Sequence, residues 1–196
     1  MTDEVIRSFI AIELPGGLVK QLKDFQAGLK SPGAHPAKWV DPGAMHLTLK
    51  FLGNVEEKGL AAVKDETGIA VCSSRRFHLV TGRTGFFPDH RKPRIFWLGL
   101  EGDIDALVTL HKTIDEAMSK LGYARENRPF TAHLTLARLR EESSINDRVD
   151  FARTVQAQVF KPPCNIEVNS VALMRSQLTQ RGAIYTRLAE FGLPDS

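Results

Sequence analysis

The tetrapeptide His-Leu-Thr-Leu occurs twice in this chain, at residues 46–49 and again at residues 133–136. Successive side chains of a β-strand point to opposite faces. On a strand, each copy therefore presents its His and Thr on one face and its two leucines on the other. One copy lies in each half of the chain, and a repeated short element usually reflects repeated structure. The repeat predicts two similar halves, each with two core leucines and a polar His/Thr pair.

The apolar pattern along the chain predicts both strands and helices. Alternating or continuous apolar runs predict strands at 7–14, 46–52, 76–81, 94–100, 130–139, 166–175 and 184–188, with a short extended piece at 39–40. Apolar residues at helical spacing predict helices at about 18–29, 56–72, 104–121 and 146–159. Several strands follow one another directly, which is typical of an α+β fold with antiparallel sheets.

No low-complexity linker divides the chain, so we expect residues 1–196 to form a single domain. Its two pseudo-symmetric lobes would each contain a mostly antiparallel sheet with helices outside and a catalytic cleft between the lobes. A net charge of +3 permits a polyanionic partner without requiring one. The two cysteines, Cys72 and Cys164, lie in apolar contexts and are expected to be buried free thiols of a reducing compartment.

The N-terminal residues are polar, unlike a signal peptide, and no apolar stretch approaches the length of a membrane span. We therefore expect a cytoplasmic protein with no membrane partner, and we expect it to be a monomer.

The two His-x-Thr pairs are suited to acid–base chemistry on a phosphate. Imidazole titrates near neutrality, so one ring can accept a proton while the other donates one, and each such transfer contributes ~10²–10⁴-fold in rate. The hydroxyls of Thr48 and Thr135 can donate to phosphate oxygens, and an arginine can add a charge-assisted bond. Arg138 follows His133 by five residues, so a regular strand would turn it to the other face. Arg138 reaches the site only if the strand bends or bulges.

A metal site is the main alternative use of two histidines. Zinc takes three or four ligands from His, Cys, Asp and Glu. The residue two positions after each His is a threonine, and the residue four positions after it is Lys50 or Ala137. Neither motif therefore supplies such a ligand. We therefore expect no metal and no cofactor. The remaining histidines share no motif and are interpreted as surface or incidental residues; they are His35, His78, His90 and His111.

Two longer signatures extend the repeat: His-Leu-Thr-Leu-Lys-Phe-Leu-Gly at 46–53 and His-Leu-Thr-Leu-Ala-Arg at 133–138. With the segments 9–15, 39–40, 87–88, 93–99, 176–178 and 182–185, they resemble the two-histidine (2H) phosphoesterase superfamily over nearly the whole chain. Within it, the chain is most similar to the bacterial and archaeal RNA 2′,3′-cyclic phosphodiesterases, historically called 2′–5′ RNA ligases. Ala132 stands where many relatives have a proline, whose absence loosens the entry to the strand.

The resemblance implies a metal-independent hydrolase that opens a 2′,3′-cyclic phosphate to a 2′-phosphomonoester. In that scheme His46 is the proton donor to the leaving 3′ oxygen, and His133 is the proton acceptor that activates water. Phe51 is a candidate contact for the nucleoside. The phosphate-binding residues that the resemblance implies are Thr48, Thr135 and Arg138.

Two other functions stay open. The same acid–base pair run in reverse would join RNA ends through a 2′–5′ linkage, and a non-catalytic module would only bind RNA ends. The intact His and Thr of both copies favour an enzyme. The resemblance implies an RNA end or a cyclic nucleotide as the substrate. The basic segment from Arg83 to Arg94 either attracts the RNA backbone or is a solvated loop.

Overall fold

The computed structural model describes residues 4–30, 36–127, 129–180 and 182–195. Within these residues the chain forms two sheets and four α-helices. The strands are β1 (Val5–Glu13), β2 (Ala37–Trp39), β3 (His46–Glu56), β4 (Phe77–Phe87), β5 (Ile95–Gly102), β6 (His133–Leu139), β7 (Asn165–Val168), β8 (Ser170–Thr179) and β9 (Gly182–Gly192). The α-helices are α1 (Gly16–Leu29), α2 (Leu60–Cys72), α3 (Ile104–Lys120) and α4 (Ile145–Gln156), and two 3₁₀ turns are η1 (Pro42–Ala44) and η2 (Glu57–Gly59).

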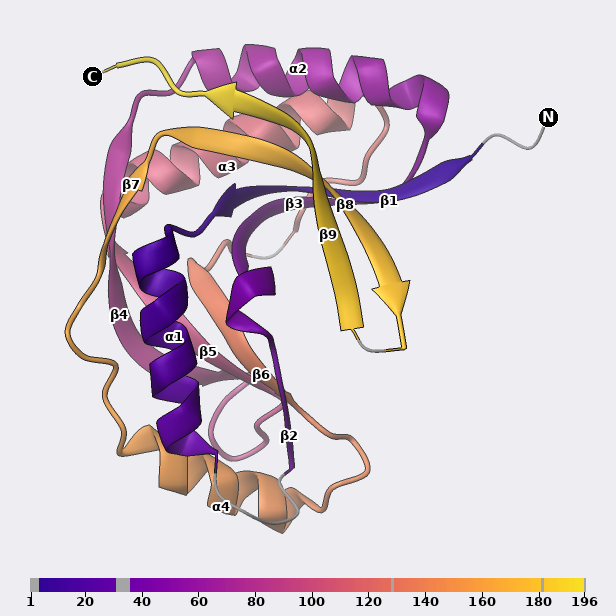
Figure 1. The fold of residues 1–196 in the computed structure, drawn as a ribbon. Coiled ribbons are helices and arrows are strands. Elements are labelled where there is room, and N and C mark those ends of the chain that lie inside the picture. The colour runs from indigo at the N-terminus through magenta and orange to yellow at the C-terminus, as the bar shows by residue number, and fades with distance from the viewer. Residues whose placement is uncertain (1–3, 31–35, 128, 181, 196) are drawn as a thin grey trace.

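The two His motifs open β3 and β6, which belong to different sheets. The four-stranded sheet has the order β3-β1-β8-β9, and the five-stranded sheet has the order β2-β6-β5-β4-β7. All strand pairs are antiparallel. Figure 1 shows the sheets as two arms that approach each other at β3 and β6, which are in contact. The predicted α+β fold with two antiparallel sheets is confirmed, and β2 is an additional strand beyond β6.

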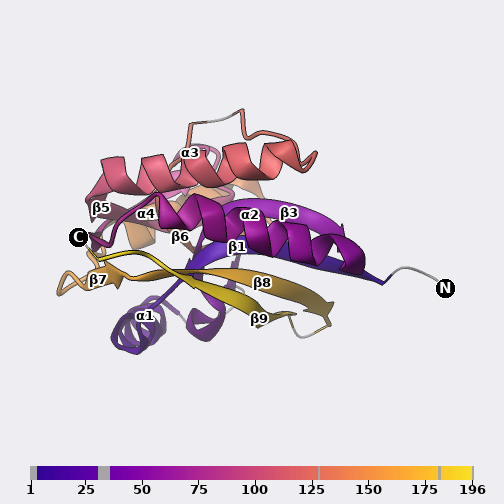
Figure 2. The ribbon, with the colours of Figure 1, turned by 90° about the horizontal axis from the view of Figure 1, so that it is seen from above.

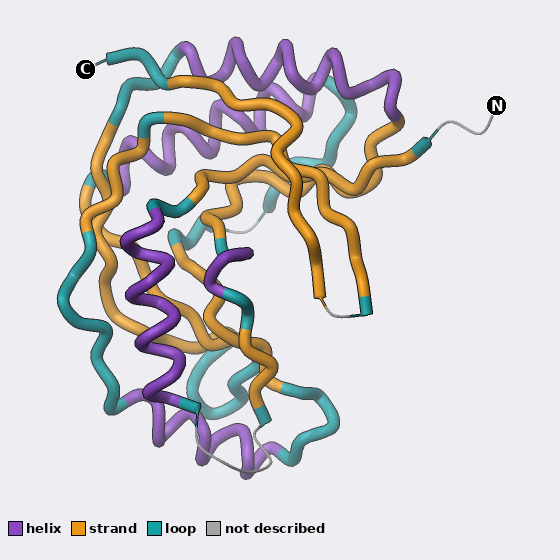
Figure 3. Tube along the Cα trace, viewed as in Figure 1, coloured by secondary structure: helices purple, strands orange, loops and turns teal. Residues whose placement is uncertain are grey.

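The helices lie around the outside of the sheets (Figure 3). Helices α2 and α3 pack side by side along the four-stranded sheet (Figure 2), and α4 lies at the far end against β4. Gln26 links helix α1 to the rest of the fold through hydrogen bonds. Its buried Nε2 donates to the carbonyl oxygens of Val40 (2.9 Å) and Leu136 (3.2 Å). This one side chain connects α1 to the segment before the first motif and to the strand of the second.

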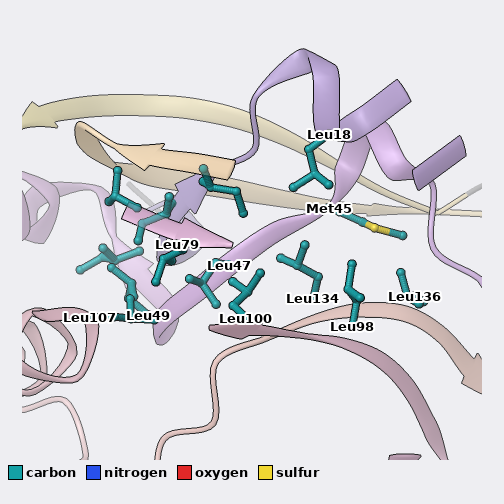
Figure 4. Close-up of a cluster of buried hydrophobic side chains, with 14 of the residues drawn as sticks. Leu18, Met45, Leu47, Leu49, Leu79, Leu98, Leu100, Leu107, Leu134 and Leu136 are labelled. Atoms are coloured by element: carbon teal, nitrogen blue, oxygen red, sulfur yellow. The ribbon is translucent and has the colours of Figure 1, made fainter. Parts of the chain in front are cut away.

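The leucines of both motifs enter the same hydrophobic core (Figure 4). Leu47 and Leu49 are 2% and 3% exposed, and Leu134 and Leu136 are fully buried. Burial of one leucine side chain stabilises a fold by about 1.5–3 kcal/mol. A one-residue slip of either strand would expose its leucines and bury its His and Thr. The core therefore fixes the face on which the polar motif residues lie.

Several strand boundaries differ from the prediction. The predicted strand at 76–81 continues as β4 to Phe87, since residues 84–87 pair with β5, and the ring of Trp97 packs against the backbone of Gly85. A Cβ at Gly85 would lie only 2.3 Å from Cζ2 of Trp97, so this glycine belongs to a packed strand rather than to a loop. The predicted strand at 166–175 is divided after Val168 into β7 and β8, which join different sheets.

Two predicted side-chain environments were wrong. His111 is 7% exposed and stacks on Phe130 with a centroid distance of 4.2 Å, so it is a core residue rather than an incidental one. Cys72 and Cys164 are free thiols, but Cys72 is exposed and Cys164 is only partly buried. His78 and His90 are exposed as expected, and His35 lies outside the described residues. In the described part of the chain, no helix combines the length and the apolar character that crossing a bilayer requires.

Candidate active site

The two motif strands have the same burial pattern at seven successive positions. In β3 and in β6 the His and Thr are partly buried and the two leucines are buried. The next residue is also buried, the one after it is exposed, and the seventh is buried again. Two successive buried residues do not occur in a regular strand with one solvent-facing side. The pattern therefore indicates the same irregularity in both halves.

That irregularity is a β-bulge after the motif threonine. On β3, Thr48 pairs with Ala11 and Lys50 pairs with Ile10, so the leucine between them has no partner. On β6 the pairing passes over Leu136 in the same way. An extra residue on one strand reverses the facing of every residue that follows. The fifth residue after each histidine, Phe51 or Arg138, therefore shares the face of its motif His and Thr.

The bulge answers the question that the sequence left open for Arg138. A regular strand would have turned its side chain away from His133 and Thr135; the bulged strand turns it toward their face, where it is exposed. Phe51 occupies the equivalent position of β3 and is 68% exposed. The two halves thus match in backbone but carry an aromatic ring in one and a cation in the other.

Both imidazoles are anchored through the same nitrogen. His46 Nδ1 lies 3.1 Å from the carbonyl oxygen of Ala44, and His133 Nδ1 lies 2.7 Å from that of Thr131. A carbonyl oxygen can only accept, so Nδ1 carries the proton in each ring. Each Nε2 is then the nitrogen left for chemistry: a lone pair when the ring is neutral, an N–H donor when it is charged.

Aromatic rings surround His46 more closely than His133. Phe9 stacks on His46 at 4.5 Å between centroids, and Tyr185 meets its edge at 4.9 Å. Burial lowers the pKa of His46, and the bond to the Ala44 carbonyl opposes that effect. Among the described residues, His133 has one aromatic neighbour of this kind, Phe87, which meets its ring edge-on at 4.9 Å. Free His46 is therefore biased toward its neutral form.

Sequence reasoning overlooked the rings that line these histidines. The sequence places Phe9, Tyr185 and Phe87 within predicted strands or resembling segments and gives none of them a role at the site. Their role follows from pairing: Phe9 lies opposite Phe51 on β1, and Tyr185 reaches the same face from β9 through the β1–β8–β9 order. Such neighbours come from distant segments, and no local pattern of the sequence could have indicated them.

The basic segment is not a single loop. Arg83 lies within β4, and the turn that follows is organised by Asp89, whose Oδ1 accepts from the backbone N–H groups of Arg91 (2.7 Å) and Lys92 (3.1 Å). Across the described residues, no three His, Cys, Asp or Glu side chains come together as a ligand set for a metal ion.

Comparison with known proteins agrees with this arrangement. The family model of the 2′-5′ RNA ligase superfamily matches residues 17–180. The RNA 2′,3′-cyclic phosphodiesterase of Methanothermobacter thermautotrophicus is 31% identical over 193 residues, which cover 96% of this chain and 99% of the relative. The protein of the same name from Aquifex aeolicus is 32% identical over 160 residues, which cover 80% of this chain and 81% of the relative.

Solved structures share the whole fold. E. coli LigT complexed with 3′-AMP superposes with a TM-score of 0.75 at 26% identity, over 97% of this chain and 99% of LigT. TT0787 of Thermus thermophilus superposes with a TM-score of 0.77 at 26% identity, over 97% of this chain and 100% of that protein.

Proposed function

Because the chain belongs to the 2′-5′ RNA ligase superfamily, we propose that it is an RNA 2′,3′-cyclic phosphodiesterase. It opens the cyclic phosphate at an RNA 3′ end to a 2′-phosphomonoester without a metal. The observation that carries the proposal is the matched pair of imidazoles, each anchored by Nδ1 to a backbone carbonyl so that Nε2 can transfer a proton. Relatives named for this activity cover nearly the whole chain.

The reaction is a single displacement at phosphorus. A water oxygen bonds to phosphorus as the bond from phosphorus to the 3′ oxygen breaks. Nε2 of His133 takes the proton from the attacking water, and Nε2 of His46 gives its proton to the 3′ oxygen, which leaves as a hydroxyl. After turnover His133 holds a proton and His46 has lost one, so exchange with solvent restores both. We expect the two rings to lie within roughly 10 Å of each other around a common phosphate.

The phosphate needs hydrogen-bond donors that stay fixed while its charge is redistributed. Thr48 and Thr135 lie two residues from the histidines on the same faces, so their hydroxyls can each donate to a non-bridging oxygen. Arg138 reaches the same face through the bulge and adds a cation. Phe51, exposed at the equivalent place in the other half, is a surface on which the nucleoside can stack.

The proton-donor role of His46 depends on the bound substrate. Burial lowers the pKa of His46 in the free protein, which disfavours the charged ring that a general acid needs. The cyclic phosphate is an anion, and a nearby negative charge raises the pKa of an imidazole. We therefore propose that His46 takes up its proton with the substrate, while the less enclosed His133 remains available as the base.

Identification of the product tests the proposal. The protein is incubated in EDTA with an RNA that ends in a 2′,3′-cyclic phosphate, and the expected product is a 2′-phosphate end. His133→Asn, whose amide can still donate to the Thr131 carbonyl, should lower turnover by about 10²–10⁴, and His78→Asn at an exposed histidine should not. A 3′-phosphate product, or activity that needs an added metal, would refute the proposed chemistry. A joined product with 5′-hydroxyl RNA would reveal the ligation reaction.

A further inference from the structure

A second cation lies beside Arg138. Lys38 of β2 is directly opposite Arg138 of β6 in the five-stranded sheet. Directly opposite residues of an antiparallel pair share a face, with Cβ atoms about 4.5–5.5 Å apart. The next residue, Trp39, points to the other face, where its ring meets Phe151 edge-on at 6.1 Å. Lys38 and Arg138 therefore both lie on the face that carries the second motif's His and Thr.

This pairing of like charges is unfavourable by itself. Directly opposite like charges destabilise a sheet, and a carboxylate between them would be the usual remedy. Both side chains are exposed, and in the described part of the chain neither forms an ion pair or a side-chain hydrogen bond. The neighbouring Arg140 has a distant carboxylate, Glu142, at 3.8 Å. An anion placed between Lys38 and Arg138 would relieve their repulsion.

That anion differs from the phosphate at the histidines. Arg138 is five residues along β6 from His133, which is roughly 15 Å of extended strand. A long arginine side chain can reach back along the strand, but Lys38 lies on the neighbouring strand β2, level with Arg138 rather than with the motif. Lysine and arginine side chains are long, so the two cations can converge on the neighbouring phosphate of the same RNA strand.

We propose that Lys38, together with Arg138, binds the phosphodiester on the 5′ side of the terminal nucleotide. The preferred substrate is then an RNA strand rather than an isolated nucleoside cyclic phosphate. The inference rests on the proposed function and adds a binding site for the RNA strand beyond its terminal nucleotide. It also gives β2 a role. β2 lies beyond β6 in the five-stranded sheet, whereas no strand of the described chain lies beyond β3 in the four-stranded sheet.

A simpler role for Lys38 is protection of the sheet edge. β2 is an edge strand, and exposed lysines on edge strands prevent pairing with other molecules. In that case replacement of Lys38 would alter solubility but not the choice between substrates. The two roles are therefore separated by substrate preference.

The test compares two substrates that differ only in the 5′ phosphodiester: a nucleoside 2′,3′-cyclic phosphate and a dinucleotide that ends in the same cyclic nucleotide. We expect the native protein to have a higher kcat/KM on the dinucleotide. Lys38→Ala should lower that kcat/KM about tenfold, the effect of one exposed charge-assisted bond, and leave the mononucleotide value unchanged. Lys38→Arg should retain the preference, and Lys112→Ala, at an exposed lysine of α3, is the matched control.

Salt dependence gives a second measure. Loss of one contact to a single-stranded phosphate should reduce the slope of log(kcat/KM) against log[salt] on the dinucleotide by about 0.7. The inference is overturned if Lys38→Ala keeps the native preference, if it lowers both substrates equally, or if Lys112→Ala has the same effect. If the native protein hydrolyses neither substrate, the proposed function itself fails.

Discussion

Loss of the buried ion pair behind the first motif should strongly lower the free energy of unfolding. Lys50, four residues after His46, is 5% exposed, and its Nζ bonds to the carboxylate of Asp115 on α3 and to the carbonyl oxygen of Ala124 at 2.5 Å. The same carboxylate accepts from the backbone N–H of Glu126 at 3.2 Å. Lys50 thus connects β3 both to α3 and to the segment that leads into the second motif.

Lys50→Met keeps most of the side-chain volume but leaves the Asp115 carboxylate buried without its cation. Removal of one partner of a buried pair typically costs 3–5 kcal/mol. For a domain of this size each kcal/mol lowers the Tm by about 2–4 °C, so the expected drop is about 6–20 °C. Burial raises the pKa of Asp115, but the bonds from Lys50 and Glu126, together with the charges of Lys50 and His111, outweigh burial, and the net pKa is lowered. The pair's contribution is therefore complete at pH 7 and is lost only as the pH falls below the usual carboxylate range.

Urea unfolding of a double-mutant cycle measures the coupling directly. In Lys50→Met/Asp115→Leu no buried charge remains, so the double variant should be more stable than Lys50→Met alone, although Ala124 and Glu126 lose a partner. Lys112→Met, at an exposed lysine on the same helix as Asp115, should change the unfolding free energy by less than about 0.5 kcal/mol. Strict additivity of the two single variants, within about 0.5 kcal/mol, would refute the reasoning.

Three further predictions concern the reaction. His46→Asn and His133→Asn should each lower kcat by about 10²–10⁴, and the double variant should be little slower than either. A double-variant loss equal to the product of the two single losses would contradict a concerted pair. Because burial lowers the pKa of His46, kcat/KM should fall as the pH rises through a value below 6.5, and kcat at saturation should fall at a higher pH; a kcat/KM limb above pH 7 would contradict the donor role. Phe51→Ala should raise KM about tenfold with little change in kcat, by loss of one stacking surface, and an unchanged KM would exclude that contact.

The parts of the fold that sequence could predict are those set by local periodicity. The motif leucines indicated which face of each strand is buried, and the direct succession of strands indicated antiparallel sheets; both predictions are confirmed. His111 carried a local signal that was passed over, since it lies four residues after Leu107 and three before Ile114 on the apolar stripe of α3. Lys50 carried none, because Asp115 is 65 residues away and a lysine four residues after a strand histidine has no characteristic partner.

The bulges were beyond sequence reasoning for a different reason. The residues after the motifs, Leu-Lys-Phe in one half and Leu-Ala-Arg in the other, are all compatible with a regular strand. A bulge is selected by what packs on the two faces: here the core accepts two successive residues, Leu49 with Lys50 and Leu136 with Ala137. Only the tertiary structure shows that both successive residues are buried in the core. From the sequence, the face of the fifth residue after each histidine therefore depended on whether the strand has a bulge.

A symmetric scaffold creates a problem for an asymmetric reaction. Two matched His-x-Thr strands would by themselves accept a cyclic phosphate in two opposite orientations, with donor and acceptor exchanged. The matched bulges expose chemically different residues at equivalent places, an aromatic ring at Phe51 and a cation at Arg138. A nucleoside prefers the ring and a phosphate prefers the cation, so on the proposed mechanism these two side chains select one orientation. That choice directs the 3′ oxygen to His46, whose enclosure by Phe9 and Tyr185 already distinguishes it from His133.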